Sequence, residues 1–524
     1  MSNPIKSAVR AGLFRLESGW DMLVGRESNP MYCLGAMSWY FFWIVGASGL
    51  YLFIPYDTSA VRAWNSIEYI SREQWYWGGL IRSLHRYGSD AMVLTMMLHL
   101  VREWCLDRYH GARWFAWFTG VPLIWMVFSS GITGYWLVWD ELAQYLAIGT
   151  AEWMDYLGIF GQSIARNFLT PGALTDRFFT LLIFIHIAVP LFLLMAMWVH
   201  ILRINRANTN PPRPLIIGSS IMLVALSLIH PAQSHPAADL GKAIGDLNPD
   251  WYFMALYPLY DSKGPLVTWA VSIGASLFLS LMPWMAFRRK RRAAAVVTSE
   301  LCNGCGNCAS DCPFGAVVLR PRSDGLHSSP KLAVMQPDLC TSCGMCMASC
   351  NKTNPFLPHT GETRQTAIDI PDFTFDLMVK RVSARTHGLV GNGRVLVIGC
   401  EHGAVLDHLK GPSVGVLPLH CTGMMPPSLI DYVFNKDLAD GVLVTACRPG
   451  ECFYRLGPEW TELRMNGERV PKLRGAVPRD RVRLFWAAST EIKALRSELA
   501  AFRVALEELP PLERPQSTKR RVTE

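Results

Sequence analysis

Two pairs of histidines at one spacing constrain the fold of this chain more than any other feature. His85 and His99 lie 14 residues apart in one apolar run, and His186 and His200 repeat that interval in another. Fourteen residues make close to four turns of α-helix, so both histidines of a pair share a helix face, separated by roughly 21 Å along the axis. Two such helices, packed side by side and running in the same direction, would oppose histidines at two levels. We therefore expect two stacked haems, each held between two histidines.

Four glycines repeat the same interval in two other apolar runs. Gly35 and Gly49 lie in the first run, and Gly120 and Gly134 lie in the third. A glycine has no side chain, so a helix that carries it can lie close to a flat ring. We interpret the four glycines as clearance for the two haem planes. Iron with a histidine on both sides has no open position, so these haems would carry electrons and not bind a gas.

Apolar runs of membrane-spanning length are confined to the first 290 residues. A helix needs about 20 apolar residues to cross a bilayer. The six runs are residues 33–54, 79–101, 113–138, 178–202, 214–230 and 265–287. Six spans leave both ends on one side, and the excess of Lys and Arg on that side makes it the cytoplasmic one. We expect a multi-pass protein of a bacterial inner membrane, in contact with its lipids and with both termini in the cytoplasm.

Three arginines lie close to these histidines. Arg82 and Arg86 flank His85, and Arg102 follows His99 by three residues. A charge inside a membrane is costly and needs a purpose. Each guanidinium could bind a haem propionate through a charge-assisted hydrogen bond. The alternative is that these side chains extend to the membrane surface.

The basic run from Arg288 to Arg292 directly follows the last apolar run. That position favours contact with the inner membrane surface and argues against a nucleic-acid partner. Residues 1–32 have the character of an amphipathic segment that lies on the same surface.

Twelve of the 14 cysteines follow residue 300, in the part expected in the cytoplasm. A reducing compartment disfavours disulfides, so groups of cysteines there indicate metal sites. Residues 295–355 contain two Cys-x2-Cys-x2-Cys-x3-Cys runs, the signature of a two-cluster bacterial ferredoxin in which the fourth cysteine of each run ligates the other cluster. One [4Fe-4S] cluster would be held by Cys302, Cys305, Cys308 and Cys350, and the other by Cys340, Cys343, Cys346 and Cys312.

A second cysteine-bearing domain, residues 393–508, follows an expected linker at 356–392 and precedes a basic tail at 509–524. It alternates strand-like and helix-like runs, which is an α/β pattern. Strands are expected at 394–400, 414–421 and 441–447, each ending in a cysteine, and helices at 428–438 and 490–507. One sheet edge would then carry a possible [2Fe-2S] site made of Cys400, Cys421, Cys447 and Cys452. Structural zinc and buried thiols are the alternatives.

The membrane part resembles cytochrome b of the bc and photosynthetic bf complexes over roughly residues 20–287. The likeness is carried by Tyr32-Cys-Leu-Gly35, His85-Arg86, Gly131-Ile-Thr-Gly-Tyr135 with Trp139-Asp140, and the helix with His186 and Pro190. It implies a quinol-oxidising membrane subunit with two haem b groups, dimeric in its cytochrome b part. Since the chain has no Rieske or Cys-x-x-Cys-His motif, a Rieske-type iron–sulfur protein or a cytochrome c is expected as a partner.

The resemblance also implies a quinol pocket and an extra haem. The family has Pro-Glu-Trp-Tyr at the outer quinol-oxidation pocket, and this chain has Asn248-Pro-Asp-Trp-Tyr252. Asp250, one methylene shorter than glutamate, would accept the quinol proton as a general base, and Tyr135 and Tyr252 would line the pocket. In the photosynthetic branch, a cysteine in the setting of Cys33 tethers a third haem by one thioether bond. A buried free cysteine is the alternative here.

The last domain resembles the delta subunit of methyl-viologen-reducing hydrogenases. The likeness lies in Leu419-His-Cys-Thr-Gly423 and Thr445-Ala-Cys-Arg-Pro-Gly-Glu-Cys452. Such subunits pass electrons between hydrogenase-like or heterodisulfide-reductase-like flavoproteins and their partners. No Gly-x-Gly-x-x-Gly follows a strand and opens a helix, so flavin and nicotinamide sites are expected on a partner subunit.

These patterns predict a multidomain chain: an all-α six-span membrane haem bundle at 33–287, an α+β ferredoxin domain and an α/β iron–sulfur domain. We expect an enzyme subunit of a quinol/quinone oxidoreductase complex. It would carry electrons between an outer quinol site, the two b haems and the cytoplasmic clusters, and pass them to a soluble flavoprotein. Two alternatives stay open. A cytoplasmic NAD(P)H dehydrogenase or hydrogenase could instead feed electrons to quinone, or the chain could be an anchor with an inactive quinone site.

Overall fold

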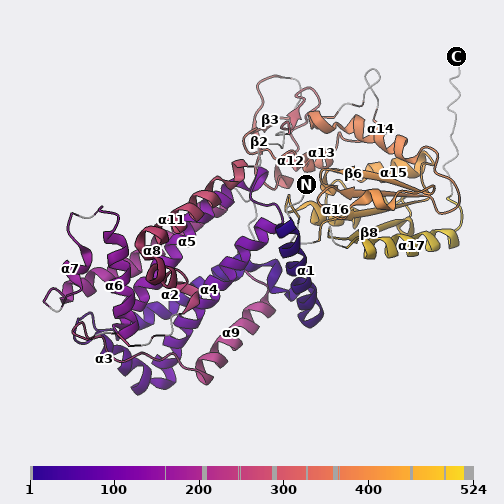
Figure 1. Ribbon diagram of the computed structural model, residues 1–524. Helices are drawn as coiled ribbons and strands as arrows, with labels where there is room; N and C mark the ends of the chain where they lie inside the picture. The colour runs from indigo at the N-terminus through magenta and orange to yellow at the C-terminus, as the bar shows by residue number, and fades with distance from the viewer. Residues whose placement is uncertain are drawn as a thin grey trace, which may run out of the picture. The chain divides into compact units, whose positions relative to one another are not determined.

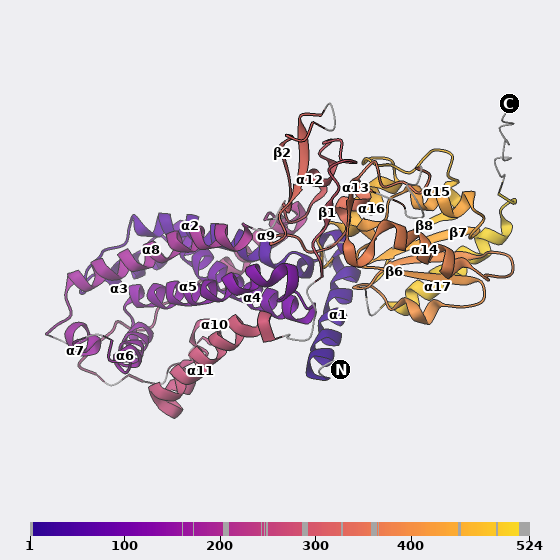
Figure 2. The same ribbon diagram turned by 90° about the horizontal axis from the view of Figure 1, so that it is seen from above.

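The computed structural model shows the course of the chain in Figure 1 and, from above, in Figure 2. It describes residues 4–159, 161–170, 172–202, 209–242, 244–245, 247, 250–285, 292–325, 329–357, 364, 366–448, 452–488 and 491–512. Asn248, Pro249, residues 288–291 of the basic run and residues 513–524 of the basic tail lie outside this range.

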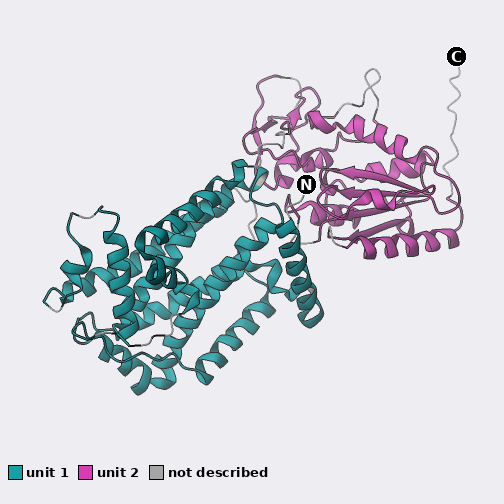
Figure 3. Ribbon diagram, in the orientation of Figure 1, with its two compact units in different colours: residues 1–202, 207–287 teal, residues 203–206, 288–524 magenta. Residues whose placement is uncertain are grey.

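The chain divides into two compact units (Figure 3). The first comprises residues 1–202 and 207–287, and the second comprises residues 203–206 and 288–524.

The first unit is helical. Its helices are α1 (Pro4–Val24), α2 (Leu34–Phe53), α3 (Ala63–Glu68), α4 (Leu80–Cys105), α5 (Trp114–Val138), α6 (Glu141–Asp155), α7 (Ile164–Phe168), α8 (Asp176–Ile201), α9 (Arg213–Ile229), α10 (Trp251–Met254) and α11 (Tyr257–Met285). α2 packs against α4, and α5 packs against α8, while α9 and α11 contact α4 and α5 respectively. The two histidine-bearing helices, α4 and α8, thus each have a glycine-bearing neighbour.

Four stretches of the described residues are long and apolar enough to cross a membrane. They are Leu34–Phe53, Trp114–Val138, Asp176–Ile201 and Trp251–Met285. Of the other two expected spans, α4 is less apolar because it carries Arg82, Arg86 and Asp90, and α9 has only 17 residues.

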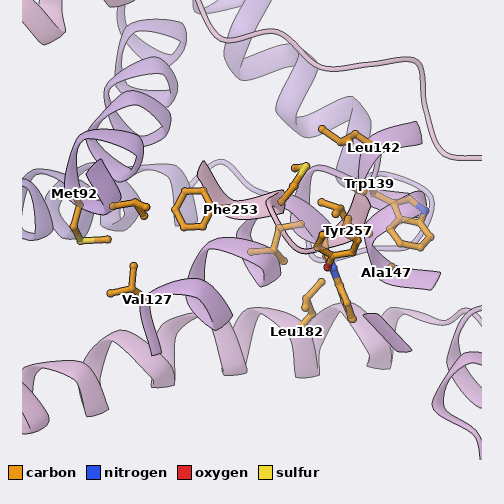
Figure 4. Close-up of a cluster of buried hydrophobic side chains, with 14 of the residues drawn as sticks. Met92, Val127, Trp139, Leu142, Ala147, Leu182, Phe253 and Tyr257 are labelled. Carbon is orange, nitrogen blue, oxygen red and sulfur yellow. The ribbon is translucent and has the colours of Figure 1, made fainter. Parts of the chain in front are cut away.

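A core of apolar side chains joins the helices of this unit (Figure 4). The ring of Phe253 from α10 lies between Met92 and Val127 on one side and Tyr257 on the other. Gly131 of α5 makes this position possible, because a Cβ there would stand 2.1 Å from the Phe253 ring. The contact holds α10, and the residue before it, against α4 and α5.

The second unit contains both helices and strands. The helices are α12 (Asn307–Asp311), α13 (Met345–Ser349), α14 (Phe375–Thr386), α15 (Ser428–Asn435), α16 (Gly457–Met465) and α17 (Ile492–Glu508). The strands are β1 (Val296–Val297), β2 (Val317–Pro321), β3 (Lys331–Met335), β4 (Ile368–Asp369), β5 (Val395–Cys400), β6 (Val414–Leu419), β7 (Gly441–Ala446) and β8 (Val482–Trp486). β1 pairs antiparallel with β4, and β2 pairs antiparallel with β3. The other four strands form a parallel sheet in the order β6-β5-β7-β8.

Helices cover both faces of the parallel sheet. In β5, Leu396 and Ile398 pack with α14 and α15, whereas Val395 and Val397 pack with α17. A parallel sheet buried on both faces needs apolar residues at every position, which is why β5 and β7 read as continuous apolar runs. α14 lies in the stretch treated as a linker in the sequence, yet its Phe375 and Val379 belong to this core.

Candidate haem and iron–sulfur sites

The structure brings the four histidines together as two opposed pairs. His85 and His99 lie on α4, and His186 and His200 lie on α8. The ring centres of His85 and His186 are 6.4 Å apart. Histidine–metal bonds are about 2 Å long, so one metal bonded to both rings would place their centres roughly 6 Å apart. The pair therefore fits one bis-histidine haem, and His99 and His200 lie on the same two helices, 14 residues further along each.

Each of the four glycines faces one of these rings. A Cβ on Gly49 would lie 3.0 Å from Cε1 of His85, and a Cβ on Gly134 would lie 2.9 Å from Cε1 of His186. At the other level the distances are 3.3 Å from Gly35 to His99 and 3.2 Å from Gly120 to His200. The glycines thus admit the histidine rings themselves, which is a second reason for the shared spacing.

The helices that carry the glycines also hold the histidine Nδ1 atoms. Nδ1 of His85 lies 2.9 Å from the carbonyl oxygen of Val45, and Nδ1 of His186 lies 3.0 Å from that of Ser130. Each carbonyl stands four residues before the facing glycine. An Nδ1–H that donates to a carbonyl leaves Nε2 without a proton, which is the form that binds a metal.

A hydroxyl residue directly before three of the glycines supports the same ring atoms. The contacts to Nδ1 are 3.1 Å from Ser48 to His85, 3.2 Å from Thr119 to His200 and 3.3 Å from Thr133 to His186. This Ser/Thr-Gly repeat is visible in the sequence as Ser48-Gly49, Thr119-Gly120 and Thr133-Gly134. It could have strengthened the assignment of the histidines.

The arginines expected at haem propionates have protein partners. Arg82 donates to the hydroxyls of Ser71 and Ser234 at 2.5 and 2.9 Å. Arg102 pairs with Glu17 of α1 at 2.9 Å, and both side chains are buried. A propionate would share these guanidinium groups with their present partners.

A half-buried polar cluster begins at Arg86, the residue after His85. Arg86 of α4 forms ion pairs with both Asp250 and Asp90. The Tyr135 hydroxyl donates to Asp250 at 2.5 Å, and the Arg86 guanidinium lies 5.1 Å from the centre of the Tyr135 ring. The backbone N–H of Tyr252 donates to Asp250 at 2.5 Å, so Asp250 caps α10. The structure thus gathers Asp250, Tyr135 and Tyr252, and adds Asp90, which the sequence analysis missed.

Asp90 had one signal in the sequence. It is an acidic residue one helical turn after Arg86 in a run otherwise short of charge. Residues four apart lie on the same helix face, so the two charges can pair.

Cys33 lies at the start of α2 and is half-buried. Its Sγ is 3.6 Å from the carbonyl oxygen of Pro30. Because Gly35 contacts His99, Cys33 lies at the level of the His99–His200 pair. Cys105, at the end of α4, is fully buried.

The ferredoxin cysteines line two pockets. The first pocket is lined by Cys302, Cys305, Cys308 and Cys350. The second pocket is lined by Cys312, Cys340, Cys343 and Cys346. Each pocket takes three cysteines from one run and one from the other, which is the crossed arrangement that a two-cluster ferredoxin requires.

The thiols of these pockets are held in an environment that disfavours charge. Burial, followed by the effect of neighbouring cysteines, raises the pKa of the Cys308 thiol to about 12, and burial similarly raises the pKa of Cys343 to about 12. Iron binds thiolates, so loading a cluster must release the thiol protons. Positive iron in the pocket would compensate the cost of burying four thiolates.

The other four cysteines, which we call the cysteine quartet, gather at the carboxyl edge of the parallel sheet. Cys400 ends β5, Cys421 follows β6, and Cys447 follows β7. The Sγ atoms of Cys400 and Cys447 are 3.9 Å apart, and the Cys452 thiol interacts directly with those of Cys421 and Cys447. All four are buried. Among the residues that the structure describes, no group of three or more His, Cys, Asp or Glu side chains has the geometry to hold a single metal ion.

Three parts of the chain match known families. Residues 20–208 match cytochrome b/b6/petB, residues 301–354 match the 4Fe-4S dicluster domain, and residues 404–510 match the methyl-viologen-reducing hydrogenase delta subunit. Cytochrome b6 of Prochlorothrix hollandica is 32% identical over 188 residues, which are 35% of this chain and 83% of that protein. The chain belongs to the cytochrome b/b6 family.

Two further cytochrome b6 proteins give the same result. Cytochrome b6 of Trichodesmium erythraeum (strain IMS101) is 31% identical over 188 residues and 83% of its length, and that of Euglena gracilis is 32% identical over 188 residues and 86% of its length. Among solved structures, a chain of a hyperthermophilic respiratory Complex III aligns with 49% of this chain and 75% of its own length, at 20% identity and a TM-score of 0.42.

The resemblances found in the sequence are therefore confirmed for all three parts of the chain. A cytochrome b domain implies a membrane protein that binds haem b and transfers electrons. The dicluster domain implies iron–sulfur clusters, and the delta-subunit-like domain is typical of multi-subunit complexes.

Proposed function

We propose that this chain is the membrane subunit of a quinol/quinone oxidoreductase complex in a bacterial inner membrane. It would oxidise quinol on the outer side and deliver electrons to a soluble cytoplasmic flavoprotein. The observation that carries the proposal is that one chain combines two levels of opposed histidines with two crossed cysteine pockets. A six-span topology with cytoplasmic termini and a dimeric cytochrome b part are included in the proposal.

The haem sites are assigned by helix pairs. His85 with His186 would hold the outer haem b, and His99 with His200 would hold the inner one. Bound haem supplies a one-electron carrier with no open ligand position. The protein's part is to fix each imidazole by its Nδ1 hydrogen bond, with Arg82, Arg86 and Arg102 available to the propionates. Cys33 is the candidate attachment point of a third haem at the inner level.

The cluster sites follow the cysteine sets. The first and second pockets would each hold a [4Fe-4S] cluster, and the cysteine quartet would hold a [2Fe-2S] cluster. Each of these iron–sulfur clusters would carry one electron at a time. The delta-subunit-like domain that contains the quartet is the expected contact of the flavoprotein.

The quinol site is assigned to the polar cluster at α10. Asp250 would accept a proton from a quinol hydroxyl as a general base, while Tyr135 and Tyr252 hold and shield its carboxylate. One electron of the quinol would pass to a Rieske-type iron–sulfur protein or a cytochrome c, and the other would enter this chain. When Asp250 is protonated, Asp90 remains as the counter-ion of Arg86, which avoids an unpaired buried charge.

The test is anaerobic reduction of the purified complex by quinol in the presence of an oxidised high-potential acceptor. Haem reduction is followed by absorption, and the clusters are followed by electron paramagnetic resonance (EPR). We expect both haems and the cluster signals to become reduced, and Asp250→Asn to slow this by about 10²-fold or more. Asp261→Asn, at an exposed carboxylate of α11, is the matched control.

Two results would contradict the proposal. If the clusters stayed oxidised while both haems became reduced, electrons would not pass from the haems to the clusters. If the substrate of the flavoprotein reduced quinone, and quinol did not reduce the clusters, electrons would flow from the cytoplasmic partner to quinone.

A further inference from the structure

The second pocket and the cysteine quartet are neighbours within the second unit. Gly344 and Met345, which follow Cys343, pack against Met424 and Gly423, which follow Cys421. Cys343 belongs to the second pocket and Cys421 to the quartet, so these contacts join two sites about 80 residues apart in the sequence.

Met345 fills the space between the two sites. It lies between Cys343 and Cys346 in the sequence and is fully buried. Its Cε is 3.6 Å from the position that a Cβ would take on Gly457, and that same position is 2.3 Å from the Sγ of Cys421 and 3.3 Å from the Sγ of Cys452. Any side chain larger than glycine at position 457 would therefore displace a quartet sulfur.

Two further glycines allow the backbones to approach. A Cβ on Gly344 would lie 2.6 Å from the Cβ of Met424, and a Cβ on Gly423 would lie 3.0 Å from the Cγ of Met345. Gly344 follows a cysteine of the second pocket directly, and Gly423 follows a cysteine of the quartet by two residues. The close approach is thus located at the ligand-bearing segments.

A buried arginine fixes the same segments to one another. The Arg464 side chain of α16 is fully buried and donates to Asp311 at 2.6 Å, to Ser349 at 2.6 Å and to the carbonyl oxygen of Gly423 at 3.0 Å. Asp311 and Ser349 each directly precede a pocket cysteine. The indole of Trp460, also from α16, donates to the Asp311 carbonyl at 3.1 Å. The junction is therefore held by hydrogen bonds as well as by packing.

The first pocket contacts the second pocket and is more exposed than the quartet. Its Cys302, Cys308 and Cys350 pack in one buried cluster with Cys312 and Cys346 of the second pocket. Its Cys305 is exposed, whereas every cysteine of the quartet is buried. The contacts thus run from the first pocket to the second pocket and from there to the quartet.

We propose that the second pocket is the electron-exchange neighbour of the cysteine quartet, across a junction formed by Met345, Met424 and Gly457. The first pocket, with exposed Cys305, is the far end of this series. One electron crosses the junction, so the group in one site is oxidised by one unit as the other is reduced, and no proton or bond changes. The inference rests on the proposed cluster ligands and adds the order of the sites.

The test uses the full chain in its complex, fully reduced, and measures magnetic relaxation of the quartet centre by EPR. A neighbouring paramagnetic cluster speeds relaxation, so removing that cluster makes the signal saturate at lower microwave power. Cys343→Ser removes a ligand of the second pocket, and Cys305→Ser removes one of the first pocket. We expect the half-saturation power of the quartet signal to fall severalfold in Cys343→Ser and to change little in Cys305→Ser.

Pulsed dipolar EPR on the unaltered complex gives the same information without a substitution. We expect the coupling of the quartet centre to the second pocket to exceed its coupling to the first. A larger effect of Cys305→Ser, or stronger coupling to the first pocket, would overturn the inference.

Other outcomes separate the inference from the proposed function. Two ferredoxin clusters without any centre at the quartet would overturn the inference and leave the haem and quinol sites standing. The predicted coupling in a complex whose haems quinol cannot reduce would support the inference and contradict the quinol assignment.

Discussion

Replacing Gly49 by valine should remove the outer haem while leaving the inner one in place. A Cβ at position 49 would lie 3.0 Å from Cε1 and 3.4 Å from Nδ1 of His85, so even alanine requires a shift of a few tenths of an ångström. Valine adds two methyl groups beyond that point. The imidazole must then turn or move away from α2, and it leaves the position opposite His186.

The size of the effect follows from two costs. Overpacking a filled site costs about 1–3 kcal/mol, and losing the hydrogen bond from Nδ1 of His85 to Val45 costs about 1 kcal/mol. If both costs fall on the haem-bound state, haem binding at this level weakens by about 2–4 kcal/mol, or roughly 30- to 700-fold.

The assay is the haem content per purified chain by the pyridine haemochrome method, together with the reduced absorption spectrum. Gly46→Val is the matched control, because Gly46 lies on the same helix and a Cβ there meets nothing within 4 Å. Gly49→Val should fall from two haems to one, and Gly46→Val should keep both. Two haems in Gly49→Val, or equal loss in both variants, would refute the assignment of Gly49 to the His85 ring.

Three further predictions concern charged groups. In Asp90→Asn, Arg86 would keep Asp250 as its one carboxylate partner, so a proton passed from quinol to Asp250 would leave the guanidinium without a counter-ion and quinol oxidation should slow by about tenfold or more; an unchanged rate would contradict this role. Arg464→Met should lower the free energy of unfolding of the second unit by about 3 kcal/mol, because it leaves the buried Asp311 carboxylate with one ion-pair partner fewer; chemical denaturation of the full chain measures it, and a loss within error would place the stabilisation elsewhere. Burial raises the pKa of Asp369 to about 6, above its unfolded value, so its contribution to stability is complete below about pH 4 and is lost as the pH rises through 6. The same denaturation assay at pH 4 and 6 should show a fall of about 2 kcal/mol that is absent in Asp369→Asn, and equal pH dependence in both proteins would contradict it.

The spacing of ligand residues carried most of the site prediction. A 14-residue interval on a regular helix determines which histidines share a level, and His85 indeed lies opposite His186. The cysteine spacing likewise determines which cysteines can share a pocket. The histidine interval and the cysteine spacing are both informative because a short stretch of backbone between two ligand residues has few conformations that let both reach one site.

Contacts between distant residues could not be predicted in this way. The pair of Arg464 with Asp311 joins residues about 150 positions apart, and nothing near either residue marks its partner. The ion pairs of Arg86 with Asp250 and of Arg102 with Glu17 were likewise not predicted, because the sequence does not reveal these carboxylates as neighbours. The assignment of both arginines to haem propionates stays a prediction.

Secondary structure was missed where polar residues hide the pattern. α14 is amphipathic, with Phe375 and Met378 buried among exposed charged residues, so its stretch resembled a linker. β8 lies at the edge of the parallel sheet and alternates in polarity at Arg483, unlike the apolar runs of β5 and β7. In both elements burial in the tertiary structure outweighs local composition.

The central claim is that one chain joins two bis-histidine haems to a series of iron–sulfur sites. An anaerobic redox titration of the purified full chain, with absorption and EPR recorded on the same samples, tests it most directly. We predict two reduced b-type haem transitions together with iron–sulfur signals that coincide with the protein in every fraction. Haem bands without iron–sulfur signals, or iron–sulfur signals without b-type bands, would contradict the claim.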